Sequence, residues 1–176
     1  MPSTFAIVSH GALTDTWDPT ATDGNRAEPG TIMATRTSTD QWSLVQCVQV
    51  DNRGVSQGEV LVTNFATLKS YSVAKASTTD GGAPLGGIAC ATIGSQKCGW
   101  MYIQGYVEKA DLSQTVASGE YISIGASTAG KLSNDKASAF NLATIVNVSA
   151  QMVVAIARTA FATGVGSISI CGCWGV

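Results

Sequence analysis

The chain has 176 residues, of which 12% are charged, against roughly 25% in an average soluble protein. Its 10 basic and 12 acidic residues give a formal net charge of −2, which argues against nucleic acid as a partner, because proteins that bind it are distinctly basic. No apolar run approaches the roughly 20 residues of a membrane-spanning helix, and residues 1–4 lack the basic start of a signal peptide, so we expect a soluble protein made in the cytoplasm, with no membrane partner.

Turn-forming residues recur at short intervals near the N-terminus, which predicts an extended, irregular arm over residues 1–40. They are Asp15, Asp18, Pro19, Asp23, Gly24, Asn25, Pro29 and Gly30. Such an arm could reach a neighbouring molecule. We expect residues 41–176 to form a single β-rich domain, since nothing in the length requires a second one.

Short strands are predicted in the first half of this domain. Trp42–Val50 is rich in β-branched residues and ends at the turn formers of residues 51–54, and Glu59–Thr63 reads as a second strand. Residues 65–75 fit a strand or a helical turn. Residues 78–87 contain glycine and proline and predict a loop that leads into the central run of residues 88–107.

Residues 100–107 predict the strand that defines the middle of the chain. Alternation places Trp100, Tyr102, Gln104 and Tyr106 on one face and Met101, Ile103, Gly105 and Val107 on the other. Neither face is polar. Such a strand needs cover on both sides, so we expect it at the centre of a barrel or sandwich, or with one face turned to another subunit.

The C-terminal part predicts a hairpin. Residues 151–158 and 165–174 read as two strands joined through residues 162–164, whereas residues 136–147 fit neither a helical nor a strand period. Trp174, near the end of the chain, indicates an anchored terminus that closes the core or contacts a neighbouring subunit. Short strands separated by glycines and without an internal repeat predict an all-β fold, a small antiparallel barrel or sandwich with an irregular N-terminal arm.

One segment resembles a phosphate-binding loop. Residues 125–132, Gly-Ala-Ser-Thr-Ala-Gly-Lys-Leu, follow a strand and match the pattern except at its last position, where Leu132 replaces the hydroxyl residue that binds magnesium. No apolar helical stripe follows. A glycine-bounded turn explains the segment better, although an enzyme that binds nucleotide through Lys131 stays as a minor alternative.

Other side chains with chemical potential are poorly placed for catalysis. His10 is the only histidine and lies in the arm, and the spacing of Asp15, Asp18 and Asp23 suits turns better than calcium ligation. Glu108 and Asp111 flank Lys109, which suits a solvated loop better than an acid–base pair. We therefore expect a protein that is not an enzyme, with no catalytic, cofactor-binding or metal site.

The five cysteines favour buried, reduced thiols, because the chain shows no secretory signal. They are Cys47, Cys90, Cys98, Cys171 and Cys173. A zinc site is a minor alternative, since Cys171 and Cys173 share a strand face, and a disulfide between strands stays open because sequence does not reveal bridge geometry.

The order of several glycine-containing segments resembles tailed-phage virion proteins of the head-decoration, or cement, type. These segments are Glu28–Thr31, Trp42–Val50, Gly58–Leu61, Gly87–Ala89, Gly99–Gly105, Ser118–Glu120 and Ala129–Leu132. The resemblance implies a small β-rich body, often a homotrimer, that sits on the outer capsid surface of the virion and clamps neighbouring major capsid proteins. It carries over no catalytic residue.

A capsid-binding protein would use buried aromatic anchors at its interface. The candidates are Trp17, Trp100, Tyr102, Tyr106 and Trp174. The alternative that these side chains fill the core stays open, most clearly for Trp100 and Trp174. A second hypothesis is a tail- or fibre-associated virion module that recognises a host surface glycan through exposed aromatic side chains.

Overall fold

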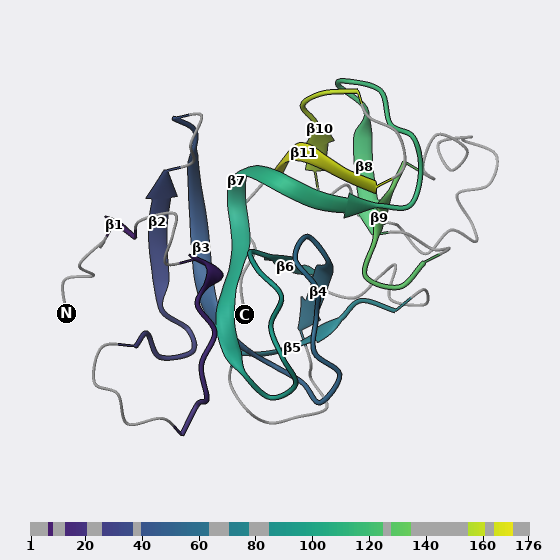
Figure 1. Cartoon of the computed structure of the whole chain (residues 1–176). Coiled ribbons are helices and arrows are strands. Elements are labelled where there is room, and N and C mark those ends of the chain that lie inside the picture. The colour runs from purple at the N-terminus through teal and green to yellow at the C-terminus, as the bar shows by residue number, and fades with distance from the viewer. Residues whose placement is uncertain are drawn as a thin grey trace, which may run out of the picture.

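Eleven strands form one hydrogen-bonded sheet in the computed structural model, which describes residues 7–8, 13–20, 26–36, 40–63, 71–77, 85–124, 128–134, 155–160 and 164–170 (Figure 1). The strands are β1 (Ile7–Val8), β2 (Ile32–Arg36), β3 (Trp42–Val50), β4 (Val60–Thr63), β5 (Ser72–Lys75), β6 (Leu85–Ala89), β7 (Cys98–Leu112), β8 (Tyr121–Ile124), β9 (Leu132–Ser133), β10 (Ala155–Ala157) and β11 (Gly164–Ile170). The predicted all-β fold is confirmed. No helix in these ranges is long and apolar enough to span a bilayer.

The sheet closes on itself twice, and both closures use β7 (Figure 1). The first ring runs β3-β5-β4-β6-β7 and returns to β3, and the second runs β7-β11-β10-β8-β9 and returns to β7. The pairs β1–β2, β3–β5 and β7–β9 are parallel, so the sheet is mixed and not purely antiparallel as predicted. The predicted C-terminal hairpin is confirmed as the antiparallel pair β10–β11.

The two rings have the same connectivity. Replacing β3, β4, β5, β6 and β7 by β7, β8, β9, β10 and β11 converts every strand pairing of the first ring into a pairing of the second. The pair β3–β5 is parallel, and so is its counterpart β7–β9, while the other pairs of both rings are antiparallel. The chain therefore contains a structural repeat, which our sequence analysis did not detect.

The repeat extends to the hydrogen bonds of single residues. Gly58 N–H donates to Ala89 O at 2.9 Å in the first ring, and Gly119 N–H donates to Ala157 O at the same distance in the second. The parallel register that pairs Val50 with Val73 recurs as Leu112 with Leu132. Val60 pairs with Ile88 as Tyr121 pairs with Ile156. These correspondences align the rings position by position.

A glutamate closes the turn that enters β4 and again the turn that enters β8. The Ser56 N–H donates to Glu59 Oε2 at 2.7 Å, and the Ala117 N–H donates to Glu120 Oε2 at 2.8 Å. Both turns carry glycine at their third residue with a φ of +84°, a left-handed conformation that a side chain disfavours. The shared sequence Val-x-x-Gly-Glu, at residues 55–59 and 116–120, encodes this turn.

Strand β7 is longer and less regular than predicted. It runs from Cys98 to Leu112, and its register shifts opposite β3 and again opposite β11. A shift of this kind inserts a residue and reverses which side chains share a face. Val107 therefore belongs to the same core cluster as Trp100 and Tyr102, and its predicted placement on the opposite face is wrong.

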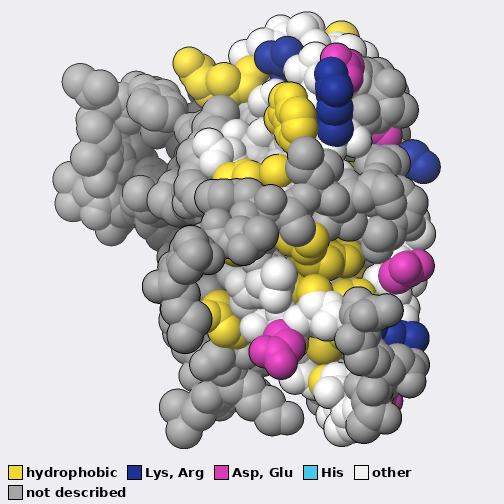
Figure 2. Space-filling model, turned by 90° about the vertical axis from the view of Figure 1, so that its left-hand side faces the viewer, with side chains coloured by type: hydrophobic (Ala, Val, Ile, Leu, Met, Phe, Trp, Pro, Cys, Tyr) yellow, Lys and Arg dark blue, Asp and Glu magenta, His cyan; other side chains and the backbone are white. Residues whose placement is uncertain are grey.

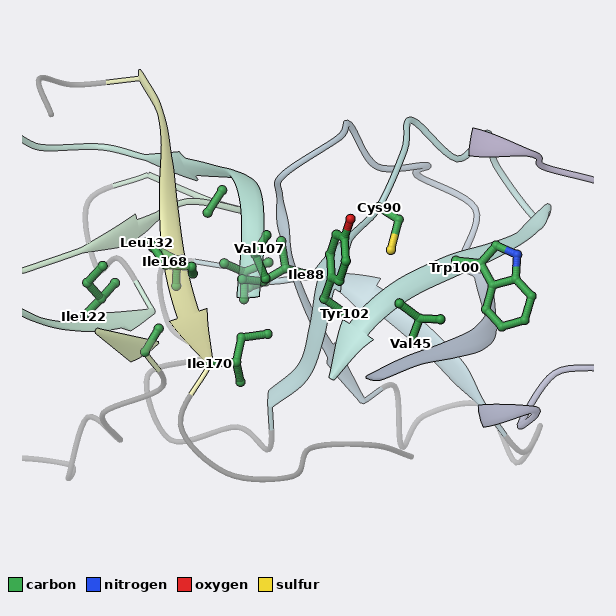
Figure 3. Packing of buried hydrophobic residues seen from close by; sticks show 14 of the residues in the cluster. Val45, Ile88, Cys90, Trp100, Tyr102, Val107, Ile122, Leu132, Ile168 and Ile170 are labelled. Atoms are coloured by element: carbon green, nitrogen blue, oxygen red, sulfur yellow. The ribbon is translucent and has the colours of Figure 1, made fainter. Parts of the chain in front are cut away.

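Both faces of the first ring are buried, as a strand with two non-polar faces requires. One cluster lies wholly among residues of this ring and its loops: Val48, Val50, Val55, Leu61, Val73, Ala89, Ile93, Met101 and Ile103. A second cluster begins on the other face of the ring and continues into the second ring, where it includes Val107, Ile122, Leu132, Ile168 and Ile170 (Figure 3). This second cluster joins the two rings into one body.

The described parts of residues 1–40 belong to the same body. Strand β2 pairs with β3, and Trp17 exchanges two backbone hydrogen bonds with Cys98 of β7, at 3.1 and 2.8 Å. Leu13 and Trp17 are buried in the core. The prediction of a separate extended arm, with a boundary between residues 40 and 41, is therefore wrong for these segments, because their backbone completes the sheet.

The joint between the rings depends on Gly105, which has a φ of +91°. A Cβ on this residue would lie 2.5 Å from the Trp42 carbonyl oxygen. We expect Gly105→Ala to lower the free energy of unfolding by about 3 kcal/mol, from backbone strain together with this clash. Gly119→Ala is the matched control, since its φ is +84° but nothing lies within 4 Å of the added Cβ, and it should cost about 1 kcal/mol. Urea denaturation measures both, and equal losses would contradict the role given to Gly105.

Candidate functional site

Three of the aromatic residues predicted as interface anchors lie in the core. Trp17, Trp100 and Tyr102 are 8%, 4% and 6% exposed, and the rings of Trp17 and Trp100 meet edge to face with centroids 6.2 Å apart. Side chains enclosed in this way cannot offer their area to another protein, so their prediction as docking anchors is wrong. Trp174 lies outside the described residues.

Tyr106 differs from the other predicted anchors. The register shift of β7 turns it away from Trp100 and Tyr102, and it pairs with Ser169 of β11. Its side chain is half-buried, and it lies on a row of cross-strand neighbours formed by Tyr121, Ile156, Ser169 and Tyr106. We call this row the Tyr121–Tyr106 row. Tyr121 is 63% exposed at its outer end.

A second apolar surface lies on the strand pair β2–β3. Ile32, Ala34, Trp42 and Leu44 share one face of this pair by register, and we call them the β2–β3 ladder. Ile32 and Trp42 are 43% and 52% exposed, whereas Thr35, Ser43 and Val45 on the opposite face are buried. The buried face of the strand pair fixes β2 and β3 in the body, so the apolar side chains of the ladder are held in place without a partner.

Charged groups border the ladder at one end. The Arg36 guanidinium lies 5.6 Å from the centroid of the Trp42 ring, and the same group forms an ion pair with Asp40. Guanidinium groups stack favourably on the electron-rich face of indole, which fixes the orientation of the ring. Figure 2 views the molecule from the β1–β2 side, where yellow hydrophobic groups lie among uncharged side chains and separate basic and acidic ones.

A polar groove of about 620 Å³ lies beside the end of β3 that is farther from Trp42. The residues that line it include Asp18, Gln49, Asp51 and Lys97. The Lys97 ammonium, 2.9 Å from Asp18 Oδ2, and hydrogen bonds from Thr20 hold the pKa of Asp18 well below its usual range. Asp18 is thus a turn former with satisfied oxygens, as the turn interpretation expects. The described lining residues include no histidine or cysteine.

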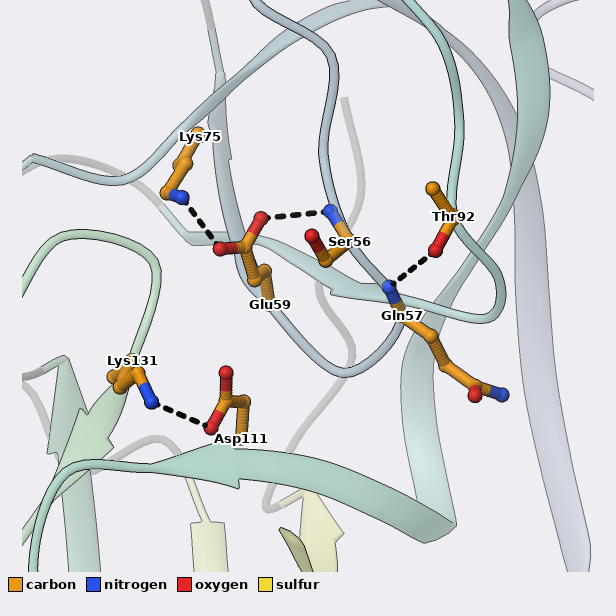
Figure 4. Close-up of polar contacts among 7 residues, drawn as sticks. All are labelled: Ser56, Gln57, Glu59, Lys75, Thr92, Asp111 and Lys131. Atoms are coloured by element: carbon orange, nitrogen blue, oxygen red, sulfur yellow. Dashed lines mark hydrogen bonds and ion pairs between the residues drawn. The ribbon is translucent and has the colours of Figure 1, made fainter. Parts of the chain in front are cut away.

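The segment that resembles a phosphate loop forms a turn in its described part. Lys131 N–H donates to Thr128 O, and Gly130, with a φ of +76°, accepts a hydrogen bond from the Val60 N–H of β4 and donates its own N–H to Ala76 O. Lys131 pairs with Asp111 at 3.1 Å, beside the pair formed by Lys75 and Glu59 (Figure 4). The two hydrogen bonds of Gly130 join this turn of the second ring to the first ring, and the contacts of Gly130 and Lys131 confirm the turn interpretation for residues 128–132. Residues 125–127 lie outside the described residues.

The structure describes only some of the other predicted site residues. Asp15 is exposed, whereas His10 and Asp23 lie outside the described residues. Glu108 and Asp111 belong to β7 and not to a loop, because the strand continues to Leu112. Among the residues that the structure describes, no group of three or more histidine, cysteine, aspartate or glutamate side chains could hold a metal ion.

Cys47, Cys90 and Cys98 are buried free thiols, which confirms the core interpretation for these three residues. Burial is the main cause that raises the pKa of Cys47 to about 12, and it also raises the pKa of Cys98 and of Cys90. Cys171 and Cys173 lie outside the described residues.

A scan of the chain against protein-family models gives no match, and a search of curated proteins gives none either. Function must therefore be inferred from the chain's own surfaces. Sequence reasoning missed Trp42 as an exposed aromatic, although the alternation along β3 places it on the same face as Leu44, away from buried Ser43 and Val45.

Trp17→Ala should lower the free energy of unfolding by about 3–5 kcal/mol, because it removes a large buried side chain from its contact with Trp100. Trp42→Ala is the matched control and should cost no more than about 1 kcal/mol, since half of that side chain already meets water. Chemical denaturation of both variants measures the difference. A Trp17→Ala protein as stable as the Trp42→Ala protein would contradict the core assignment.

The three buried thiols should resist alkylation in the native protein at pH 8, because a raised pKa leaves almost no reactive thiolate and burial excludes the reagent. In denaturant the same thiols should react at least about 100-fold faster. Mass spectrometry of iodoacetamide-treated peptides assigns the label to each cysteine. Rapid labelling of native Cys47, Cys90 or Cys98 would show that the core around them opens readily.

Proposed function

We propose that the protein is a non-enzymatic capsid decoration, or cement, protein of a tailed phage. It binds the outer surface of the assembled head and stabilises contacts between major capsid proteins. The observation that carries this proposal is the β2–β3 ladder, a partly exposed apolar face held rigidly by strands whose other face is buried. Aromatic and aliphatic side chains of this kind supply most of the binding energy at protein interfaces.

The rigidity of the two-ring body favours tight binding to the capsid. Two closed rings with a shared core leave little conformational freedom to be lost when the protein binds, so more of the contact energy appears as affinity. A ligand that binds only the assembled lattice stabilises that lattice by mass action, by about 2.7 kcal/mol per site when its concentration is 100 times Kd. The sparse charge of the chain suits a surface that meets protein and not nucleic acid.

Co-sedimentation with phage heads that lack the protein tests the proposal. We expect saturable binding at a fixed number of molecules per head and a higher melting temperature of the shell. Trp42→Ala should weaken binding at least about tenfold, as loss of a large aromatic anchor does. Asn52→Ala, an exposed substitution in a turn away from the ladder, is the control and should bind like the wild type. Absence of wild-type binding to the heads would overturn the proposal.

The alternative function is a tail- or fibre-associated module that recognises a host surface glycan, and one observation favours it. Trp42 is exposed and lies beside the charged Arg36 and Asp40, an arrangement in which the indole face can stack on a sugar ring while polar groups bind its hydroxyls. Binding of the isolated protein to host cells, lost in Trp42→Ala and without affinity for heads, would select this function.

A further inference from the structure

Equivalent rows of side chains are buried in the first ring and partly exposed in the second. In the first ring the row runs Val60, Ile88, Tyr102 and Val45 across β4, β6, β7 and β3, and all four side chains are buried. Its counterpart in the second ring is the Tyr121–Tyr106 row, across β8, β10, β11 and β7. None of its four side chains is fully buried, and Tyr121 is the large hydrophobic side chain with the highest exposed fraction among the described residues.

The side chains that cover the row of the first ring indicate which kind of partner suits the row of the second. The buried row belongs to the core cluster that continues into the second ring, where Val107 is a member (Figure 3). The same cluster contains Leu13 and Trp17 of the N-terminal segment, so side chains of the second ring and of that segment pack with the row of the first ring. The row of the second ring has no third ring to cover it among the described residues, and a second copy of the chain offers an equivalent row that covers it.

The composition of the exposed row suits contact with its own copy. The row itself contains no charged residue. On the same face, Asp111 lies opposite Val165 and pairs with Lys131, and Arg158 lies opposite Ser167, so the charges nearest the row are of both signs. Val165 is 59% exposed and extends the apolar area. A two-fold axis through the middle of the row places Ile156 over Ser169 of the other copy, a large side chain over a small one, and Tyr121 over Tyr106.

We propose that the Tyr121–Tyr106 row is a two-fold interface between two copies of this chain. The β2–β3 ladder belongs to the other ring and stays available for a different partner. This proposal does not depend on capsid binding, since it concerns the isolated protein. It replaces the trimer that the resemblance to decoration proteins implies with a dimer.

Sedimentation equilibrium of the full chain tests the interface, with Tyr121→Asp and Val165→Asp as disruptive variants and Trp42→Asp as the matched control. All three positions are at least half exposed, so each variant should keep its fold, which thermal denaturation checks. We expect a dimer for the wild type and for Trp42→Asp. The two disruptive variants should dissociate at least about 100-fold more readily, because each substitution occurs twice in a two-fold interface.

A mixing experiment tests the register. Tyr121→Asp and Tyr106→Lys proteins should each be weak dimers, whereas a mixture should form a heterodimer in which the new aspartate faces the new lysine and the other Tyr121–Tyr106 contact is intact. A monomeric wild type, a trimer, or a mixture that does not associate would overturn the two-fold pairing. Loss of head binding in Trp42→Asp with the dimer intact would concern the proposed function alone.

Discussion

Strand β7 is the constraint on which the rest of the fold depends, because it is the last strand of one ring and the first of the other (Figure 1). Fifteen residues give it the length to pair with β3 and β6 in its first part and with β11 and β9 in its second. Its register shifts bend the strand between these partners, and Gly105 lets the backbone of β3 approach closely at the bend. Neither ring can open without disturbing the strand that closes the other, so we infer that the two rings unfold together.

The repeat explains how one body carries two different surfaces. Strand connectivity is the same in both rings, as is the glutamate that closes each entry turn, so the fold distinguishes them little. Side chains do. Val60 and Tyr102 in the buried row of the first ring become Tyr121 and Ser169 in the second, a change from a core-forming pair to a pair that tolerates water. The functional information of this chain therefore lies in the differences between equivalent positions.

Local sequence determined the strands well and their long-range contacts poorly. Trp42–Val50 was predicted with its true bounds, because β-branched residues end there at a run of turn formers. Trp17 was misplaced because its partner Cys98 is far away along the chain, and no local period reports a bridge between them. Tyr106 and Val107 were assigned to the wrong faces because a register shift is invisible in an alternating pattern. Of the repeat, the sequence retains little beyond Val-x-x-Gly-Glu at residues 55–59 and 116–120, too short a signal to stand out among glycine-rich turns.

The two proposed surfaces reinforce one another through the geometry of the rings. The β2–β3 ladder is built on the first ring and the Tyr121–Tyr106 row on the second, so a dimer formed through the row carries two ladders, one from each copy. A bivalent molecule binds a regular lattice with an avidity that can exceed the affinity of one ladder by about 10²–10⁴, provided that both ladders reach their sites together. A single ladder of a few apolar side chains is a modest contact by itself. On a repeating shell, pairing through a neutral row would convert it into a clamp that bridges two lattice positions, without adding charge or any chemical step to either surface.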